Sequence, residues 1–397
     1  MPEIRHTKRC EMPTIILPTC DGRLTPYRLS GSAPYPLRPT CKFNRVAFAA
    51  VHVVADPFGE QDPWLDTKID WNATLAYRRY LWDLGLGVAE AMDTAQRGMG
   101  LGWPTSLQLI RRSVEAAKGT PDALIFCGAG TDHLPPGDAG LTQVVDAYEQ
   151  QIGEVEKVGG RVILMASRAL AAAARGPEEY GEVYHRILRQ IREKAIIHWL
   201  GEMFDPALAG YWGHRDIAPA IEVVLDVIRR NAAKIDGIKI SLLDKHHEIA
   251  MRRRLPNGVR MYTGDDFSYA ELIAGDEHGH SDALLGIFDA IAPAAAAALS
   301  ALSERGVTRF REILEPTIPL ARHIFQAPTR FYKTGIVFMA YLNGHQNHFV
   351  MVGGQESARS IVHLAELFRL ADKAGLLADP EIGAYRMAAV LRTHGID

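Results

Sequence analysis

Short apolar runs alternate with longer amphipathic segments from Val46 onward, and this alternation limits the fold more than any other feature of the chain. The apolar runs have the length of strands and lie at Val46–Val54, Gly87–Met92, Ala123–Cys127, Arg161–Ala166, Ala195–Leu200, Gly237–Leu242, Arg260–Thr263 and Ala283–Phe288. The segments between them have helical periodicity and lie at Asn72–Leu84, Ser106–Lys118, Thr142–Val158, Glu178–Glu193, Ala218–Ala233, His246–Arg254 and Tyr269–Ala274. Such alternation predicts an α/β protein with a parallel sheet covered by helices.

The number of strand-helix units favours a closed (β/α)8 TIM barrel over an open, doubly wound sheet. A doubly wound dinucleotide-binding sheet carries G-x-G-x-x-G after its first strand, whereas Val53–Phe58 reads VVADPF here. We therefore predict a barrel over residues 46–300. The proline-rich residues 1–45 are expected to form an N-terminal arm, and residues 301–397 a C-terminal helical extension, because the chain continues well beyond the length that one closing helix needs.

Charge and apolar content exclude several classes of function. The chain of 397 residues has 44 basic and 47 acidic side chains and a net charge of −3, so it lacks the basic field that nucleic-acid binding requires. It has neither a signal-peptide pattern nor an apolar run of about 18 residues, so we expect no membrane partner. Its four cysteines contain no C-x-x-C pair. This cysteine usage favours a reducing compartment and a cytoplasmic protein.

Polar side chains follow the predicted strands at their carboxyl ends, where barrel enzymes hold their active sites. In chain order they are His52, Asp56, Asp93, Thr94, His133, Ser167, Arg168, His198, Lys239, Ser241, Asp265, Asp266 and Asp289. We expect the functional site among them.

Lys239 is the sharpest of these signals, because it interrupts the apolar strand Gly237–Leu242. Strand alternation places it on the face of Gly237 and Ser241, inside the barrel, with the isoleucines directed toward the helices. Burial lowers the pKa of a lysine and gives the neutral amine that attacks a carbonyl to form a Schiff base. The alternative is a structural lysine paired with Asp93 or Asp265.

Five short segments, in chain order around Lys239, resemble the dihydrodipicolinate synthase and N-acetylneuraminate lyase superfamily of class I aldolases. The segments are Ala55-Asp56-Pro57-Phe58, Ile69-Asp70-Trp71, Gly237-Ile238-Lys239, Thr263-Gly264-Asp265-Asp266 and Ala290-Ile291-Ala292-Pro293. They are similar to that superfamily's TPF, VDF, G-[IV]-K, SGDD and NVAP motifs. The resemblance implies a TIM barrel in which Lys239 forms the imine, and it suggests a homo-oligomer, either a dimer or a tetramer.

The chain departs from this pattern at three places that bear on the substrate. Met92–Gln96 replaces the GTTGE segment that holds a pyruvate carboxylate in the superfamily, and Asp93 would repel a carboxylate there. His198 stands where the superfamily has the tyrosine of YNVP, and an imidazole is able to transfer the proton instead. Tyr211, beyond an inserted loop over 201–210, is the other candidate for that role if the loop folds back.

These observations predict a Schiff-base-forming lyase or aldolase that acts on an oxo-acid or a sugar-acid-like carbonyl compound, without a cofactor besides the imine. We expect Lys239 as nucleophile and His198 or Tyr211 as proton carrier. The residues expected to bind substrate are Asp93, Thr94, Arg168, Ser241, Gly264 and Asp265.

Two alternatives remain open from the sequence. His52, Asp93, His133 and His198 stand at four strand ends and would suit one divalent cation in a metal-dependent barrel hydrolase or aldolase. A barrel that binds a small ligand without turnover is the other alternative, because a fold does not by itself carry a function.

Overall fold

A closed barrel of parallel strands forms the larger part of the molecule. The structure, a computed structural model, describes residues 12–31, 35, 39–60, 62, 64–134 and 139–397. Within these residues eight strands close the barrel: β3 (Ala47–Ala50), β4 (Gly87–Glu90), β5 (Ile125–Ala129), β6 (Arg161–Leu164), β7 (Ala195–Leu200), β8 (Ile235–Ser241), β9 (Arg260–Thr263) and β10 (Asp282–Leu285). Neighbours in the chain are neighbours in the sheet, and β10 pairs with β3. The predicted (β/α)8 barrel is confirmed.

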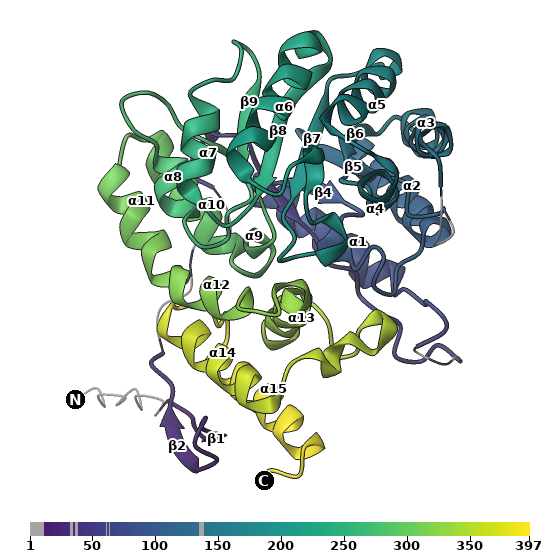
Figure 1. Cartoon of the computed structure of the whole chain (residues 1–397). Coiled ribbons are helices and arrows are strands. Elements are labelled where there is room, and N and C mark those ends of the chain that lie inside the picture. Colours follow the sequence, from purple (N-terminus) through teal and green to yellow (C-terminus); the bar gives the residue numbers. More distant parts are fainter. Residues whose placement is uncertain (1–11, 32–34, 36–38, 61, 63, 135–138) are drawn as a thin grey trace, which may run out of the picture.

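Helices cover the outside of this barrel (Figure 1). They are α1 (Trp71–Asp83), α2 (Trp103–Lys118), α3 (Leu141–Lys157), α4 (Arg168–Ala173), α5 (Pro177–Gln190), α6 (Ile217–Arg230), α7 (Lys245–Arg252) and α8 (Tyr269–Ala274). The Asp70 carboxylate accepts a hydrogen bond from the Ala73 amide and caps α1. The seven helices expected from periodicity all form, and the short α4 is an additional one.

Several strands end earlier than the apolar runs suggest. The run Val46–Val54 forms a strand only as far as Ala50, and the run ending at Phe288 leaves the sheet after Leu285. Val51, Val53 and Val54 are nevertheless buried. Burial therefore continues past the ladder, because the chain turns over the barrel end beneath further helices, and an apolar run cannot distinguish these two situations.

Aromatic side chains pack inside the barrel beneath its polar end. The ring of Phe48 lies 5.4 Å from that of Phe126 and 6.0 Å from that of Tyr262, measured between centroids. Both pairs have the edge-to-face arrangement that aromatic rings prefer. Together with aliphatic side chains from the other strands they fill the interior. The barrel is thus a packed core, and its chemistry lies at one end.

After β10 the chain forms α9 (Ile287–Ala290) and α10 (Ala292–Ser303), and the last residues of α10 accept hydrogen bonds from Asn44, shortly before β3. A helical extension follows, and its α13 lies across the polar end of the barrel. The extension consists of α11 (Val307–Leu314), α12 (Ile318–Ile324), α13 (Tyr332–Leu342), α14 (Ile361–Lys373) and α15 (Pro380–Thr393), with short 3-10 turns η5 (Glu315–Thr317), η6 (Thr329–Phe331) and η7 (Val352–Ala358). Figure 1 shows α12 and α13 between the barrel and α14 and α15. Every residue of α13 is buried, so this helix has no solvent face.

The predicted N-terminal arm contains a β-hairpin that the sequence analysis missed. Strand β1 (Thr14–Pro18) pairs antiparallel with β2 (Leu24–Arg28). The Tyr27 hydroxyl donates a hydrogen bond of 2.7 Å to Asp372 on α14. A two-stranded hairpin is marginal in isolation, and this one is packed against the extension. Residues 1–11, 32–34 and 36–38 of the predicted arm lie outside the described residues.

No helix in the described part of the chain has the length and apolar content needed to cross a membrane.

Candidate active site

Lys239 lies inside the barrel at the end that the extension covers. It sits on β8 between His198 of β7 and Tyr262 of β9, which are its partners in the two ladders. The residue is 4% exposed. Burial lowers the pKa of the Lys239 ammonium below its ordinary value, whereas Asp93 and Asp266 act in the opposite direction. The strand alternation therefore places Lys239 where the sequence predicts it.

Two glycines make room for side chains on this inner face, one for Tyr262 and one for Lys239. A β-carbon on Gly237 would lie 2.6 Å from the Tyr262 ring, so the aromatic core fits only against a bare backbone there. A β-carbon on Gly264 would lie 2.9 Å from Cε of Lys239 and 2.6 Å from the Ile240 carbonyl oxygen. These separations are shorter than carbon contacts allow. Gly264 thus acts through its backbone, as a close wall beside the lysine.

His198 and Ser241 are neighbours of Lys239 on the same inner face. The His198 Nε2 atom lies 3.2 Å from the Ser241 hydroxyl, and its Nδ1 atom is buried without a partner among the described residues. Burial, together with Lys239, lowers the pKa of His198 to about 3. The imidazole is therefore neutral at physiological pH and has one ring nitrogen free to accept a proton or hold a substrate hydroxyl.

Asp93 and Thr94 follow β4 in a short 3-10 turn, η1 (Asp93–Ala95), and meet a tyrosine from the extension. The Tyr332 hydroxyl lies 2.7 Å from the Thr94 hydroxyl and donates a hydrogen bond of 2.9 Å to Asp93. Burial alone would raise the pKa of Asp93, but Lys239 and other nearby donors lower it to about 2. Asp93 is thus an anion beside Lys239.

The two acids after β9 have different surroundings. Asp265 accepts hydrogen bonds from the Phe267 and Ser268 amides, which hold the turn that leads into α8. Asp266 is buried and accepts a hydrogen bond from the Ile287 amide. Burial raises the pKa of Asp266 to about 8, although Lys239 partly counteracts this effect. Asp266 therefore carries a proton at neutral pH and leaves Asp93 as the charged partner of the lysine.

Tyr211 lies in a different group of side chains from Tyr332. Its hydroxyl accepts a hydrogen bond of 3.1 Å from the Ser167 amide and lies 3.0 Å from the Tyr184 hydroxyl on α5. Its ring packs at 4.9 Å, between centroids, against Tyr180. These contacts hold Tyr211 in the helical layer, and it is Tyr332 that reaches the turn after β4.

Arg168 lies at the start of α4, with 56% of its side chain exposed. Its guanidinium group forms an ion pair of 2.5 Å with Asp205, which lies in the inserted loop after β7. The structure therefore brings Lys239, His198, Ser241, Asp93 and Thr94 together and leaves Arg168 at the rim.

The histidines considered for a metal site have separate partners. His52 forms a buried pair of 2.8 Å with Asp289, and the Nδ1 atom of His133 lies 2.7 Å from Gln151. Across the described residues, no three histidine, cysteine or acidic side chains have the arrangement of a metal site. The four strand ends thus do not converge on one point.

Two residues of this site, Tyr332 and Lys333, were missed because they belong to the extension. The Lys333 side chain is buried, and its ammonium donates hydrogen bonds to the Arg330 carbonyl oxygen at 3.1 Å and to the Met99 sulfur at 3.3 Å. A signal for them does exist in the sequence. Lys333 is a charged residue shortly before a long apolar run, Ile336–Leu342, whereas Lys239 interrupts such a run.

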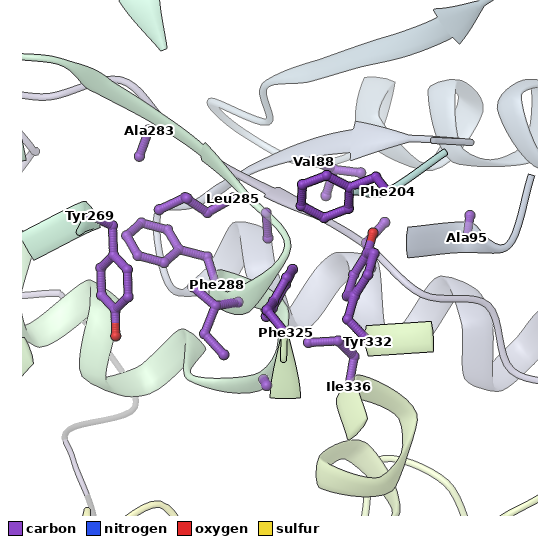
Figure 2. Close-up of a cluster of buried hydrophobic side chains, with 14 of the residues drawn as sticks. Val88, Ala95, Phe204, Tyr269, Ala283, Leu285, Phe288, Phe325, Tyr332 and Ile336 are labelled. Atoms are coloured by element: carbon purple, nitrogen blue, oxygen red, sulfur yellow. The ribbon is translucent and has the colours of Figure 1, made fainter. Parts of the chain in front are cut away.

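Aromatic rings fix the position of Tyr332. Its ring stacks on Phe325 with centroids 4.4 Å apart and meets Phe204, from the inserted loop, edge to face at 5.9 Å. Figure 2 shows Tyr332 beside Phe325 and Phe204, with its hydroxyl directed away from Ile336. The loop after β7 and the extension therefore hold this tyrosine jointly.

Comparison with known proteins gives a family without a described function. A family model with the description "Protein of unknown function (DUF993)" matches residues 15–396. No curated protein matches the chain.

Solved structures with a similar fold come from dihydrodipicolinate synthases. A putative dihydrodipicolinate synthetase from Pseudomonas aeruginosa has 14% identity and a TM-score of 0.63 over 83% of this chain and 99% of its own. YagE, a prophage protein of the dihydrodipicolinic acid synthase family from E. coli K12 in complex with pyruvate, has 13% identity and a TM-score of 0.65 over 84% and 99%. The synthase from Thermotoga maritima has 15% identity and a TM-score of 0.60 over 84% and 99%. At these identities the likeness concerns the fold, and at that level it confirms the resemblance expected from the five segments.

Proposed function

The chain belongs to the DUF993 family, and from the arrangement around Lys239 we propose that it is a lyase of the class I aldolase type. The substrate is a carbonyl compound of the oxo-acid or sugar-acid kind, and Lys239 forms a Schiff base with it. One observation carries the proposal: a lysine at the polar end of a barrel is buried beside a single charged carboxylate, Asp93, and a neutral histidine, His198. The fold shared with dihydrodipicolinate synthase structures supports it.

Imine formation begins with the neutral amine of Lys239. Its lone pair forms a bond to the carbonyl carbon, and the carbonyl oxygen takes up a proton. Loss of that oxygen as water leaves a protonated imine. When an adjacent carbon–carbon bond breaks, this cation accepts its electron pair and becomes an enamine. When a carbon–oxygen bond breaks instead, the cation first accepts the electron pair of a neighbouring carbon–hydrogen bond, whose proton is removed, and the enamine then expels the oxygen together with the electron pair of the carbon–oxygen bond. The same steps in reverse make either bond. The burial that lowers the Lys239 pKa supplies the amine in the form that this step needs.

Proton transfer is assigned to the hydrogen-bonded series Thr94, Tyr332 and Asp93. Since Tyr332 donates to Asp93, the Thr94 hydroxyl is the donor to Tyr332. Burial raises the pKa of the Tyr332 phenol well above its ordinary value, so the hydroxyl keeps its proton and acts as a donor and relay. Tyr332 takes the role for which Tyr211 was considered. His198 is neutral and paired with Ser241. It orients a substrate hydroxyl or accepts the proton that this hydroxyl loses.

Borohydride reduction tests the first step, because it converts an imine into a stable amine of predictable mass. The protein is incubated with pyruvate, hydroxypyruvate, glyoxylate or glycolaldehyde, reduced, and examined by intact mass and peptide mapping. We expect one adduct, on the peptide that contains Lys239, and none in Lys239→Ala. Lys118→Ala, which removes an exposed lysine of α2, is the matched control and keeps the adduct.

An adduct that persists in Lys239→Ala, or the absence of an adduct with every carbonyl compound, contradicts the proposal. In the second case, an increase in melting temperature with one of these compounds favours the ligand-binding barrel without turnover.

A further inference from the structure

A second buried lysine, Lys333, belongs to the same end of the barrel and is not used by the chemistry above. It lies in the first turn of α13 and is almost fully buried. Its two hydrogen-bond partners, the Arg330 carbonyl oxygen and the Met99 sulfur, are both uncharged, and sulfur is a weak acceptor. A buried ammonium group normally has an anionic partner, since removal from water is costly for a charge. The ammonium also lies 4.9 Å from the centroid of the Tyr332 ring, so none of these three contacts supplies a negative charge.

Further positive charge surrounds Lys333 at the rim. Burial is the largest cause of the lowered pKa of Lys333; Asp93 and then Asp205 raise this pKa, and Arg168 and Arg330 lower it by smaller amounts, so that the result is about 8. Lys333 contacts Met99, and a β-carbon on the preceding Gly98 would lie 3.6 Å from the Arg168 guanidinium group. The loop residues Gly98 and Met99 therefore lie between the Arg168 guanidinium group and the Lys333 ammonium group. Asp205, one of the two acids that raise the Lys333 pKa, is bound to Arg168.

Lys333 and Lys239 share one acidic neighbour, Asp93. Asp93 is the carboxylate with the largest effect on the pKa of each lysine. Tyr332, the residue before Lys333 in α13, bonds Asp93 directly, and the Lys333 ammonium lies 4.9 Å from the centroid of the Tyr332 ring. The extension thus brings Lys333 to the side chain that also acts on Lys239 of β8. Asp93 itself disfavours an anion at the turn after β4, so the positive side of the site is the side of the extension.

We propose that Lys333, with Arg330 and Arg168, binds the anionic group of the carbonyl substrate, a carboxylate or a phosphate monoester. This inference rests on the proposed function, because it concerns the compound that forms the imine with Lys239. It assigns substrate selection to the extension and imine chemistry to the barrel. Arg168 then has the binding role that the sequence predicts for it, in company with two residues that the sequence analysis missed.

Paired probes test the inference through the concentration at which borohydride trapping is half-maximal. Pyruvate is compared with uncharged hydroxyacetone, and dihydroxyacetone phosphate with dihydroxyacetone. In Lys333→Gln we expect this concentration to rise about tenfold to a hundredfold for the anionic probe and to stay constant for the uncharged one, as for the loss of one charged hydrogen bond. Arg330→Gln, at an exposed position, gives a smaller rise. The pair with the larger discrimination identifies a carboxylate or a phosphate as the natural group.

Three controls keep the outcome interpretable. Lys333→Arg retains the charge and restores discrimination, which a variant damaged in folding cannot do. Lys118→Gln leaves both probes unaffected, because its ion pair lies on the outside of α2. Equal effects of Lys333→Gln on charged and uncharged probes, or no effect on either, overturn the inference.

A second measurement is independent of the imine. In Lys239→Ala, inorganic phosphate or acetate is expected to raise the melting temperature, and in Lys239→Ala combined with Lys333→Gln the increase is expected to disappear. An increase that persists in the double variant, or no increase in either, argues against the anion site. Failure of the proposed function has a different signature, namely no trapped adduct with any probe while the anion effect remains.

Discussion

The barrel and the C-terminal extension each bury a lysine near Asp93, but they place it by different means. Lys239 enters the site through strand alternation on β8, a local rule that acts over neighbouring residues. Lys333 enters because α13 packs across the barrel end, and Tyr332 beside it bonds Thr94, which is 238 residues away in the chain. The comparison teaches that the position of Lys239 depends on local strand geometry, whereas its surroundings depend on tertiary packing. The two parts are therefore open to separate experimental tests.

The largest effect is expected from the tyrosine that the extension contributes. Tyr332→Phe removes the donor to Asp93 and the acceptor for Thr94, so the rate of adduct formation and turnover should fall by about 10²- to 10⁴-fold, as for the loss of a general acid–base group. Tyr211→Phe is the matched variant in the helical layer and should leave the rate within a few-fold. Rapid-quench borohydride trapping measures both rates. A slower reaction in Tyr211→Phe than in Tyr332→Phe would reverse the assignment.

The packing between the two regions is tested next by Phe325→Ala. This ring is 1% exposed and stacks on Tyr332, so its loss should cost about 3–5 kcal/mol of unfolding free energy. Because the extension shares its core with the barrel, we expect one cooperative denaturant transition that moves to lower denaturant concentration. Phe58→Ala, at a ring that is 93% exposed, is the control and should change stability little. An early, separate transition in Phe325→Ala would show that the extension unfolds by itself.

A smaller effect is expected in the pH dependence of imine formation. Asp93 raises the pKa of Lys239 against the effect of burial. In Asp93→Asn the pKa of Lys239 therefore falls further, more of the amine is neutral at low pH, and the acid limb of the trapping rate moves to lower pH. Rates measured from about pH 5 to about pH 9 show the shift. Asp205→Asn, which removes the partner of Arg168, should leave the limb in place, and a limb that moves to higher pH in Asp93→Asn would contradict the arrangement.

The last effect, which is small near neutral pH, concerns stability in acid. The pKa of His198 is lowered to about 3 in the folded protein, so below about pH 6.5 the unfolded chain binds a proton that the folded one does not. This histidine then removes up to about 1.4 kcal/mol of stability per pH unit as the pH falls from about 6.5 toward 3. In His198→Asn the free energy of unfolding should therefore fall less steeply as the pH is lowered.

His363 on α14 supplies the matched variant in the extension, since burial also lowers its pKa to about 3. If the barrel and the extension unfold together, His363→Asn also reduces the slope of the unfolding free energy against pH. Exposed His246, replaced by asparagine, is the control. A slope that is unchanged in His198→Asn would mean that water reaches this imidazole.

The sequence predicts the barrel well because each strand-helix unit carries its own pattern. Lys239, His198 and Ser241 follow from alternation on two neighbouring strands, and the structure brings them together. Asp93 and Thr94 follow from their place after β4. The catalytic and binding roles of these residues stay predictions until the experiments above are performed.

The remainder of the site could not be read from local patterns. Tyr332 reaches Thr94 only because the buried helix α13 crosses the barrel end, and nothing in its own apolar sequence states where it packs. Tyr211 had a suitable residue type, but Tyr184 and Ser167 hold its hydroxyl in the helical layer. The hairpin β1–β2 was missed because Pro18 and Pro26 obscure two strands whose stability comes from α14.

That hairpin also sets an order of events during synthesis. The hydrogen bond between Tyr27 and Asp372 joins residues 345 positions apart, among the longest separations that a chain of this size allows. Contacts of such high contact order form late, because the intervening chain must first be arranged. The strands β1 and β2 therefore dock only after α14 has emerged from the ribosome. A nascent chain halted before α13 would present Lys239 without Tyr332 and Lys333, so this end of the barrel is incomplete until α13 has packed across it.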